Sequence, residues 1–370
     1  MKKILITANL LLSSLLINAQ DTTSFELDTT KKTMPFHLSY IYPLSTNGLQ
    51  AHKIQNKVSV NILVGVSAGV GSFEGAGFGN LTDGNVNGTQ LAGFFNANRG
   101  NVRGVQAAGF FNSVDGAFKG GQFAGFANVN TGQFTGGQFA GFCNVNTSNM
   151  RGGQFSGFSN TVVGDLKGVQ ASGFVNVVTD TLNGTQVSGF LNYAKHVKGF
   201  QIGVININDT ISGGLPIGFF SYSKTGYHKF EVEGSNLPFA SVSFKTGVEK
   251  FYNIFTAGAG TSSNDFVWGA GYGIGTLFAL NNKLDMNIDI TSTQLYKEDI
   301  DIEKVNLINK LKINVAYSVT ENVQVYGGPS IDVLVHDKSL DSEMGNALKE
   351  WDSPSAITKL SIGFNAGIRF

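Results

Sequence analysis

The sequence contains few charges and a single cysteine. Charged residues make up 14% of the 370 residues, and Lys+Arg and Asp+Glu balance at 26 each. This balance gives no sign of a nucleic-acid or acidic partner, because neither charge dominates the field of the protein. Such low charge is unusual for a cytosolic enzyme and suits a β-rich envelope protein. Cys143 cannot form an intramolecular disulfide, and we interpret it as a small apolar filler in a variable position of the repeat described below.

The sequence also lacks a catalytic or metal-binding motif. Its five histidines are scattered without metal-ligand spacing, and no G-G-x-G-x-D calcium repeat occurs. The aspartates near the repeats have no regular carboxylate partner, which glycoside hydrolysis would need. The glycines at 269–275 resemble a dinucleotide fingerprint, but they lie in an alternating strand with no helix after it. We therefore predict a non-enzymatic protein without catalytic residues, cofactor or metal.

The first 20 residues have the pattern of a secretory signal peptide. Lys2 and Lys3 precede an apolar stretch from residue 4 to residue 17, and a polar, acidic segment follows Gln20. An N-terminal membrane anchor is the alternative, but the apolar stretch is shorter than the ~20 residues that a spanning helix needs. We expect an exported protein that is cleaved near Gln20.

Glycine, phenylalanine and a short repeat are abundant. The chain has 48 Gly and 30 Phe, and the motif G-x-Q-x-x-G-F-x-N recurs with a period of 16 residues. The Gly-Phe pairs begin at Gly77 and continue to Gly189, and degenerate copies follow at 203–206 and 218–221. A 16-residue unit is too short for a helical hairpin or a transmembrane β-hairpin. It fits one coil of a parallel β-solenoid, and we predict about ten such coils between residues 58 and 225.

Stacked coils place identical side chains above one another. Because side chains alternate along a strand, Gln106, Ala108, Phe110 and Asn112 share one face, which we predict to point inward. On this interpretation the Phe rings form the core ladder, and the Asn and Gln side chains form amide ladders. The predicted ladders contain Phe94, Phe110, Phe126, Phe142, Phe158, Phe174 and Phe190; Asn96, Asn112, Asn128, Asn144, Asn160 and Asn176; and Gln106, Gln122, Gln138, Gln154 and Gln170. Residues equivalent to Phe118, namely Val102, Phe134, Met150, Leu166 and Leu182, are expected to close the core from the other side.

The opposite face of the same strands is less regular and apolar. It carries Leu91, Phe123, Phe139, Phe155 and Val187, among others. Two interpretations stay open. This face is an exposed apolar sheet that docks against a partner; alternatively, the inside and outside are exchanged or both faces are covered.

From residue 226 to the end the pattern changes to longer alternating strands. The segments 284–293, 311–320 and 359–370 each place apolar residues on one face and polar residues on the other. Their length and alternation are typical of outer-membrane barrel strands, as is the alternation of short turns with longer charged connections. A soluble β-sandwich is the alternative. We predict a small antiparallel barrel of about eight strands.

The first strand of this barrel has two candidates. Seven strands can be counted from residue 239 onward, and such a barrel needs an even number. We favour PFHLSYIYPL (35–44), which is apolar and aromatic, over HKFEVEG (228–234), which is short and charged. The first choice would make the repeats a large loop at the cell surface, and the second would leave them in the periplasm. The predicted division is a signal peptide (1–20), an N-terminal segment (21–57), a repeat domain (58–225) and a barrel (226–370).

The repeats resemble those of bacterial surface-repeat proteins, a family whose function is poorly described. The ending S-I-G-F-N-A-G-I-R-F is similar to the last strand of many outer-membrane β-barrel proteins of Gram-negative bacteria. This second resemblance implies a barrel surrounded by outer-membrane lipid, with Phe370 as the assembly signal for the barrel-assembly machinery. We expect a structural or adhesive role through the stacked repeats, with a surface ligand or protein as partner. A channel or transport component and a carbohydrate-binding or carbohydrate-active solenoid are the alternatives.

Overall fold

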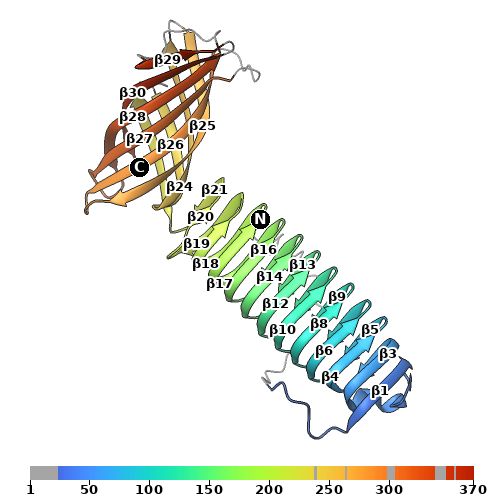
Figure 1. Ribbon diagram of the computed structural model, residues 1–370. Coiled ribbons are helices and arrows are strands. Elements are labelled where there is room, and N and C mark those ends of the chain that lie inside the picture. Colours follow the sequence, from blue (N-terminus) through green and yellow to red (C-terminus); the bar gives the residue numbers. More distant parts are fainter. Residues whose placement is uncertain (1–23, 237–239, 263–264, 298–304, 338–346, 354–355) are drawn as a thin grey trace. The chain divides into compact units, whose positions relative to one another are not determined.

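The computed structural model describes residues 24–236, 240–262, 265–297, 305–337, 347–353 and 356–370. The all-β prediction is confirmed: the chain forms a parallel β-solenoid of about 11 turns and a closed barrel of eight antiparallel strands (Figure 1). The chain divides into two compact units, and the division falls between Asn208 and Leu215. No helix among the described residues is long and apolar enough to cross a membrane. The predicted signal peptide lies outside the described residues.

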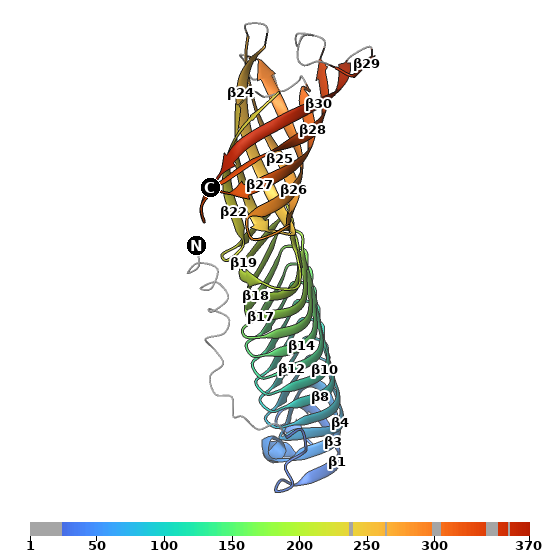
Figure 2. The same ribbon diagram turned by 90° about the vertical axis from the view of Figure 1, so that its left-hand side faces the viewer.

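The solenoid is built from alternating long and short strands, and its successive coils are visible in Figure 2. It begins with β1 (Thr33–Ile41), β2 (Leu44–Ser45), the 3-10 helix η1 (Gly48–Lys53), β3 (Gln55–Ser67) and β4 (Gly69–Ala76). The long strands are then β6 (Val86–Ala92), β8 (Val102–Ala108), β10 (Phe118–Ala124), β12 (Phe134–Ala140), β14 (Met150–Ser156) and β16 (Leu166–Ser172). The short strands are β5 (Gly79–Thr82), β7 (Phe95–Asn98), β9 (Phe111–Val114), β11 (Ala127–Asn130), β13 (Cys143–Asn146) and β15 (Ser159–Val162). The sheet ends with β17 (Val175–Ser188), β18 (Leu191–Ile202), β19 (Ile205–Ile211), β20 (Pro216–Ile217) and β21 (Phe220–Ser223).

The register of the coils follows the 16-residue period. In the parallel pair β10–β12, Gln122 lies opposite Gln138 and Phe123 lies opposite Phe139. In the short-strand pair β11–β13, Asn128 lies opposite Asn144. Each residue is therefore stacked on its equivalent in the next coil.

The interior of the solenoid contains two amide ladders. Each Asn side chain donates from Nδ2 to Oδ1 of the next Asn, as in Asn112 to Asn128 at 2.9 Å and Asn128 to Asn144 at 2.9 Å. Each Gln donates from Nε2 in the opposite direction, as in Gln138 to Gln122 at 2.8 Å. These side chains are fully buried. An amide can form a hydrogen bond with the identical amide in the next coil because it carries both a donor and an acceptor.

The apolar core was predicted to contain the Phe118 column on one side and the Phe110 ladder on the other, and only the first of these is buried. Val102, Phe118, Phe134, Met150, Leu166 and Leu182 are all at most 2% exposed. The Phe110 ladder was predicted to complete this core, and that prediction is wrong. Its rings do stack on one another, with centroids 4.8–5.2 Å apart from Phe78 to Phe190, but each ring is 39–47% exposed.

A bend explains why the Phe110 ladder lies outside. Strand β8 ends at Ala108 and β9 begins at Phe111, so Gly109 and Phe110 form the corner between two strands. The alternation of inward and outward side chains restarts after this corner. The interior therefore contains Gln106 and Asn112, while Phe110 points outward.

Close packing of the coils also requires glycine at one position in each long strand. Gly120 has φ +141°, a conformation that L-residues with a side chain rarely adopt. A Cβ at this position would also collide with the carbonyl oxygen of Gly104 in the preceding coil. The glycine two residues before each Gln is therefore a requirement of the backbone.

The barrel consists of consecutive antiparallel strands that close on themselves. Its strands are β22 (Tyr227–Ser235), β23 (Ala240–Val248), β24 (Phe251–Ser262), β25 (Asp265–Ala279), β26 (Leu284–Lys297), β27 (Leu307–Ser318), β28 (Gln324–Asp337) and β30 (Ala356–Arg369). Pairing of Val232 in β22 with Ile368 in β30 closes the ring. A ninth strand, β29 (Lys349–Asp352), pairs with β30 outside the ring. The alternation predicted for 359–370 is present, since Ile362, Phe364 and Ile368 point outward.

The first barrel strand is the candidate that the sequence analysis did not favour. Residues 227–235 form β22, whereas 33–41 form β1, which pairs in parallel with β3 of the solenoid. The charges that counted against this segment face the barrel interior, where Glu231 and Glu233 are 3% and 5% exposed. A charged strand fits this barrel because its charges find partners inside.

Candidate functional site

The long strands of the solenoid present three columns of outward side chains, which together form what we call the ladder face. The positions of Arg103, Val105 and Ala107 in β8 define these columns, and register pairing carries each one through the repeats. The third column contains Leu91, Ala107, Phe123, Phe139, Phe155, Ala171, Val187 and Ile202. Leu91, the three phenylalanines and Val187 are 39–42% exposed. This face is therefore exposed along the long strands, as the first of the two interpretations requires, and its docking against a partner stays a prediction.

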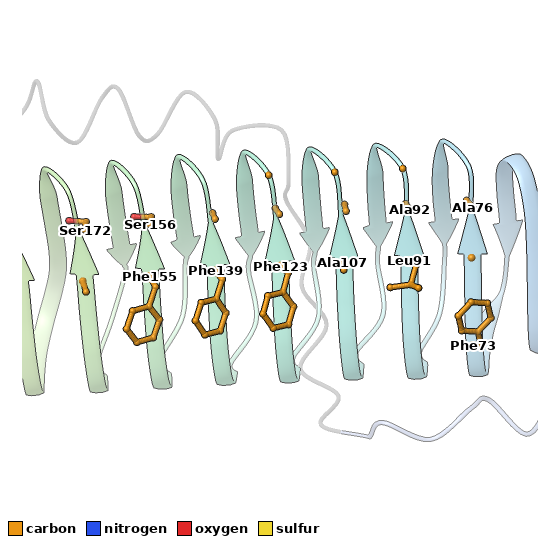
Figure 3. A pocket seen from close by; sticks show the side chains of 18 of the residues that line it. Phe73, Ala76, Leu91, Ala92, Ala107, Phe123, Phe139, Phe155, Ser156 and Ser172 are labelled. Carbon is orange, nitrogen blue, oxygen red and sulfur yellow. The ribbon is translucent and has the colours of Figure 1, made fainter.

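The phenylalanines of the third column are supported by glycines of the middle column. Phe139 follows Gly137 in β12, and a Cβ on this glycine would lie 2.7 Å from the Phe139 ring. The same arrangement places Phe123 over Gly121 and Phe155 over Gly153. Neighbouring rings have centroids 5.1 Å apart, and Figure 3 shows them in a row on consecutive strands. Each ring thus lies back along its own strand and extends toward the first column.

A shallow apolar groove runs across the coils beside this row of rings. It has a volume of about 1190 Å³ and extends from Phe73 and Gly75 to Val187. Figure 3 shows its lining between Phe73 and Ser172. Its lining consists of Phe, Leu, Val, Ala and Gly side chains together with Ser156 and Ser172. The hydroxyl oxygens of both serines are buried and have no hydrogen-bond partner. The accessible surface of the groove is therefore mainly apolar, with a minor polar share.

The first column of the ladder face is basic. It contains Asn87, Arg103, Lys119, Thr135, Arg151, Lys167, Asn183 and Lys198. Arg103 lies directly opposite Lys119, and Arg151 lies directly opposite Lys167. None of the outward positions in the three columns carries a carboxylate. Like charges directly opposite each other are destabilising, so this column is complementary to an anionic partner.

The N-terminal segment covers a small part of this face. The guanidinium of Arg103 lies 4.8 Å from the centroid of the Phe25 ring, and Asn87 donates to the carbonyl oxygen of Phe25 at 2.8 Å. Within the described part of the chain, Lys119, Arg151 and Lys167 form no ion pair. The basic column is therefore accessible from Lys119 onward.

The basic column was missed by the sequence analysis, although a signal was present. Arg103, Lys119, Arg151 and Lys167 each stand three residues before a repeat Gln. The balanced total charge concealed this column, because its cations are offset by acids elsewhere in the chain. The predicted amide ladders are present but lie inside, where no ligand can reach them. The predicted Phe ladder is accessible, and it forms the corner next to the ladder face.

The solenoid interior also contains one carboxylate. Glu74 occupies the Gln column, opposite Gln90, and accepts from Gln90 Nε2 at 2.8 Å and from Thr82 Oγ1 at 3.0 Å. Burial raises the pKa of Glu74 above its usual range. Ser59 and His37 follow in the same column and are 2.9 Å apart. All three side chains are fully buried, so this Ser, His and Glu combination offers no access to a substrate.

The barrel interior is crossed by ion pairs. Lys245 Nζ lies 2.9 Å from Glu231 and 2.7 Å from Asp289, and Arg369 Nε lies 2.6 Å from Glu231. A second pair joins Lys312 and Glu233 at 2.8 Å. Phe370, the predicted assembly signal, is 54% exposed, and its backbone N–H donates to the Phe230 carbonyl at 2.9 Å. The interior of the barrel thus contains a network of buried ion pairs, of which Glu231–Arg369 joins the first and last strands, together with two clusters of buried apolar and tyrosine side chains.

Metal chemistry gains no support from the geometry. Among the described residues, no group of three or more His, Cys, Asp or Glu side chains is arranged to hold a metal ion. Comparison of the chain with protein-family models, with curated proteins and with solved structures finds no match. Functional inference therefore depends on the ladder face and on the barrel.

Proposed function

We propose that the protein is an exported, non-enzymatic outer-membrane protein, whose barrel anchors a repeat domain that binds through its outer surface. The observation that carries the proposal is the inside-out pattern of the barrel. Val242, Ile290, Ile331, Ile362 and Phe364 point outward and are 49–65% exposed. The middle of the interior holds polar and charged residues such as Lys245, Asp289 and Arg369, and two smaller apolar clusters are also buried there. A continuous apolar outer surface with a polar interior is the pattern of barrels that sit in lipid.

The connections between barrel strands support a periplasmic location for the repeats. Turns at 249–250, 280–283 and 319–323 join strands at one end of the barrel. The two longest connections, from β26 to β27 and from β28 to β30, belong to the other end. Outer-membrane barrels have short turns in the periplasm and longer loops outside. Strand β22 begins at the short-turn end, so the repeats that precede it in the chain belong on the periplasmic side.

The filled interior counts against the channel alternative. An eight-stranded barrel is just wide enough to be packed by its own side chains. Here Lys245 and Arg369 form ion pairs across the interior, and both are at most 1% exposed. We therefore assign the barrel an anchoring role. Planar-bilayer recordings should show no steady conductance from the purified protein.

Protease treatment of intact and permeabilised cells tests the proposal. We expect the repeats to survive in intact cells and to be cleaved after the outer membrane is permeabilised, while the protein is extracted only by detergent. Cleavage of the repeats in intact cells would overturn the periplasmic location. Recovery of the protein in a detergent-free soluble fraction would overturn the membrane anchor. Release of reducing ends from cell-wall or plant polysaccharides would instead support the enzymatic alternative.

A further inference from the structure

The ladder face combines an apolar feature and a cationic feature side by side. Its third column and groove are mainly apolar, and its first column contains cations and no carboxylate. We propose that this face binds a lipid with an anionic head group. The acyl chain of the lipid lies in the groove, and its head group lies at the basic column. The inference rests on the proposed binding role of the repeats and names its ligand class.

The geometry brings the two features within the reach of one amphiphile. Lys119 and Gly121 are two residues apart on β10, which is roughly 7 Å along a strand. The Phe123 ring lies over Gly121, so the apolar surface begins directly beside the cation. The strands from Gly75 to Val187 span seven coil spacings, or roughly 34 Å at ~4.8 Å each. A single leaflet of a ~30 Å hydrocarbon core is about 15 Å deep, so the groove can hold an extended acyl chain.

The lining of the groove favours a lipid over a polysaccharide. A sugar brings many hydroxyl groups, and most of them would lose water without gaining a hydrogen bond, because Ser156 and Ser172 are the only polar side chains among the residues that line the groove. An alkyl chain has no such groups, and its burial is favourable in proportion to apolar area. A second copy of this chain is also disfavoured as the occupant. Its ladder face offers the same cations and no carboxylates to pair with them.

Photolabelling of the full-length protein tests the inference. The protein is reconstituted in phosphatidylcholine nanodiscs and irradiated with a C16 fatty acid that carries a diazirine in its chain, and adducts are mapped by peptide mass spectrometry. A C16 trimethylammonium probe with the same diazirine serves as the matched cation. We expect adducts of the fatty acid on β10, β12 and β14, with few adducts of the cationic probe there. Barrel peptides should be labelled by both probes because they contact the nanodisc lipid.

Charge variants sharpen the test. Replacing Lys119, Arg151 and Lys167 together by Gln should lower groove labelling by about tenfold or more, because each cation near an anionic head group contributes to binding. A control that replaces the exposed Lys195, Lys224 and Lys250 by Gln changes the net charge equally and should leave groove labelling unchanged. Circular dichroism and the labelled barrel peptides show whether each variant is folded and embedded.

Several results would overturn the inference. Groove adducts that are equally strong with the cationic probe, or unchanged in the Lys119, Arg151 and Lys167 variant, would contradict an anionic ligand. A repeat domain without adducts would contradict a lipid ligand, and a dimer in the same sample would point to a second copy instead. Labelled barrel peptides with unlabelled repeats would refute this inference alone, whereas an unlabelled barrel would refute the proposed membrane anchor.

Discussion

The solenoid and the barrel both bury polar side chains, but they satisfy them in different ways. In the solenoid, the buried groups are neutral amides such as Asn128, which is hydrogen-bonded to its own copies in the coils before and after it. In the barrel, the buried groups are charges such as Lys245, which lies between Glu231 and Asp289. A translational repeat lets one residue type be its own partner, and an amide can do so because it both donates and accepts. A barrel strand has no translational copy, so opposite charges must be placed on different strands.

The largest effect is expected from breaking the charge network of the barrel. Lys245→Met leaves Glu231 and Asp289 buried without their shared cation. Removing one partner of a buried ion pair costs about 3–5 kcal/mol. Urea unfolding of the barrel in lipid vesicles should show this loss. Lys283→Met, at an exposed turn, is the control and should stay within about 0.5 kcal/mol of the natural protein. A Lys245→Met protein as stable as this control would show that the pairs do not stabilise the barrel.

Two phenylalanines of the solenoid test which ladder forms the core. Phe118 is 1% exposed, and Phe118→Ala should destabilise the solenoid by about 3–5 kcal/mol. Phe126 is 39% exposed at the corner, and Phe126→Ala should cost less than half as much because its ring already contacts water. Thermal unfolding followed by circular dichroism compares the two. If the order were reversed, the corner ladder would be the core.

The amide ladder can be interrupted by removing a donor. Asn128→Asp replaces the Nδ2 group that donates to Asn144 Oδ1 at 2.9 Å and to the Phe139 carbonyl at 2.8 Å. An oxygen in its place faces two acceptors, and such an unsatisfied buried group costs about 1–3 kcal/mol. Gln133→Glu makes the same change from amide to acid at an exposed position and is the matched control for the added charge. Equal thermal stability of the two variants would contradict a buried ladder.

The smallest effect is expected from completing the Gln column. Burial raises the pKa of Glu74, so the folded protein keeps this proton at pH values where the unfolded chain has lost it. Stability therefore falls as the pH rises above the ordinary Glu pKa of 4.5. Glu74→Gln removes this dependence and adds an amide to the ladder, for a gain of about 0.5–1.5 kcal/mol at pH 7–8. Unfolding curves between pH 4 and pH 8 measure it, and a gain that grows toward low pH would contradict the assigned shift.

The sequence predicts the stacking of the coils better than their orientation. A fixed period of 16 residues is enough to place Gln122 opposite Gln138, because every coil repeats the same backbone. The inward or outward direction of Phe110 depends on a corner at Gly109, and a pattern of alternation does not show where a strand stops. The charges of residues 228–234 argued against a barrel strand for a similar reason. The partners of Glu231 lie on strands far away in the sequence, so the sequence does not show that this charge is paired.

The candidate site was only partly readable from the sequence. The apolar column was visible because Phe123, Phe139 and Phe155 recur at one position. The exposure of this column could not be predicted from the sequence, because both faces of a solenoid strand can be apolar. The basic column was visible in principle, since Lys119 and Arg151 precede Gln122 and Gln154 by the same interval. Its meaning depends on the knowledge that this position points outward beside the groove, which only the structure supplies.

Cysteine cross-linking across one coil step tests the stacked arrangement most directly. In a Cys143→Ser background, Phe126→Cys and Phe142→Cys are introduced together, at positions where the natural rings have centroids 4.9 Å apart. Coils in register bring the two Cα atoms within the ~4.4–6.8 Å range that a disulfide needs. The account predicts rapid formation of this disulfide and none between Cys residues at 126 and 134, since Phe134 lies in the interior. A bridge between 126 and 134, with none between 126 and 142, would contradict the 16-residue coil.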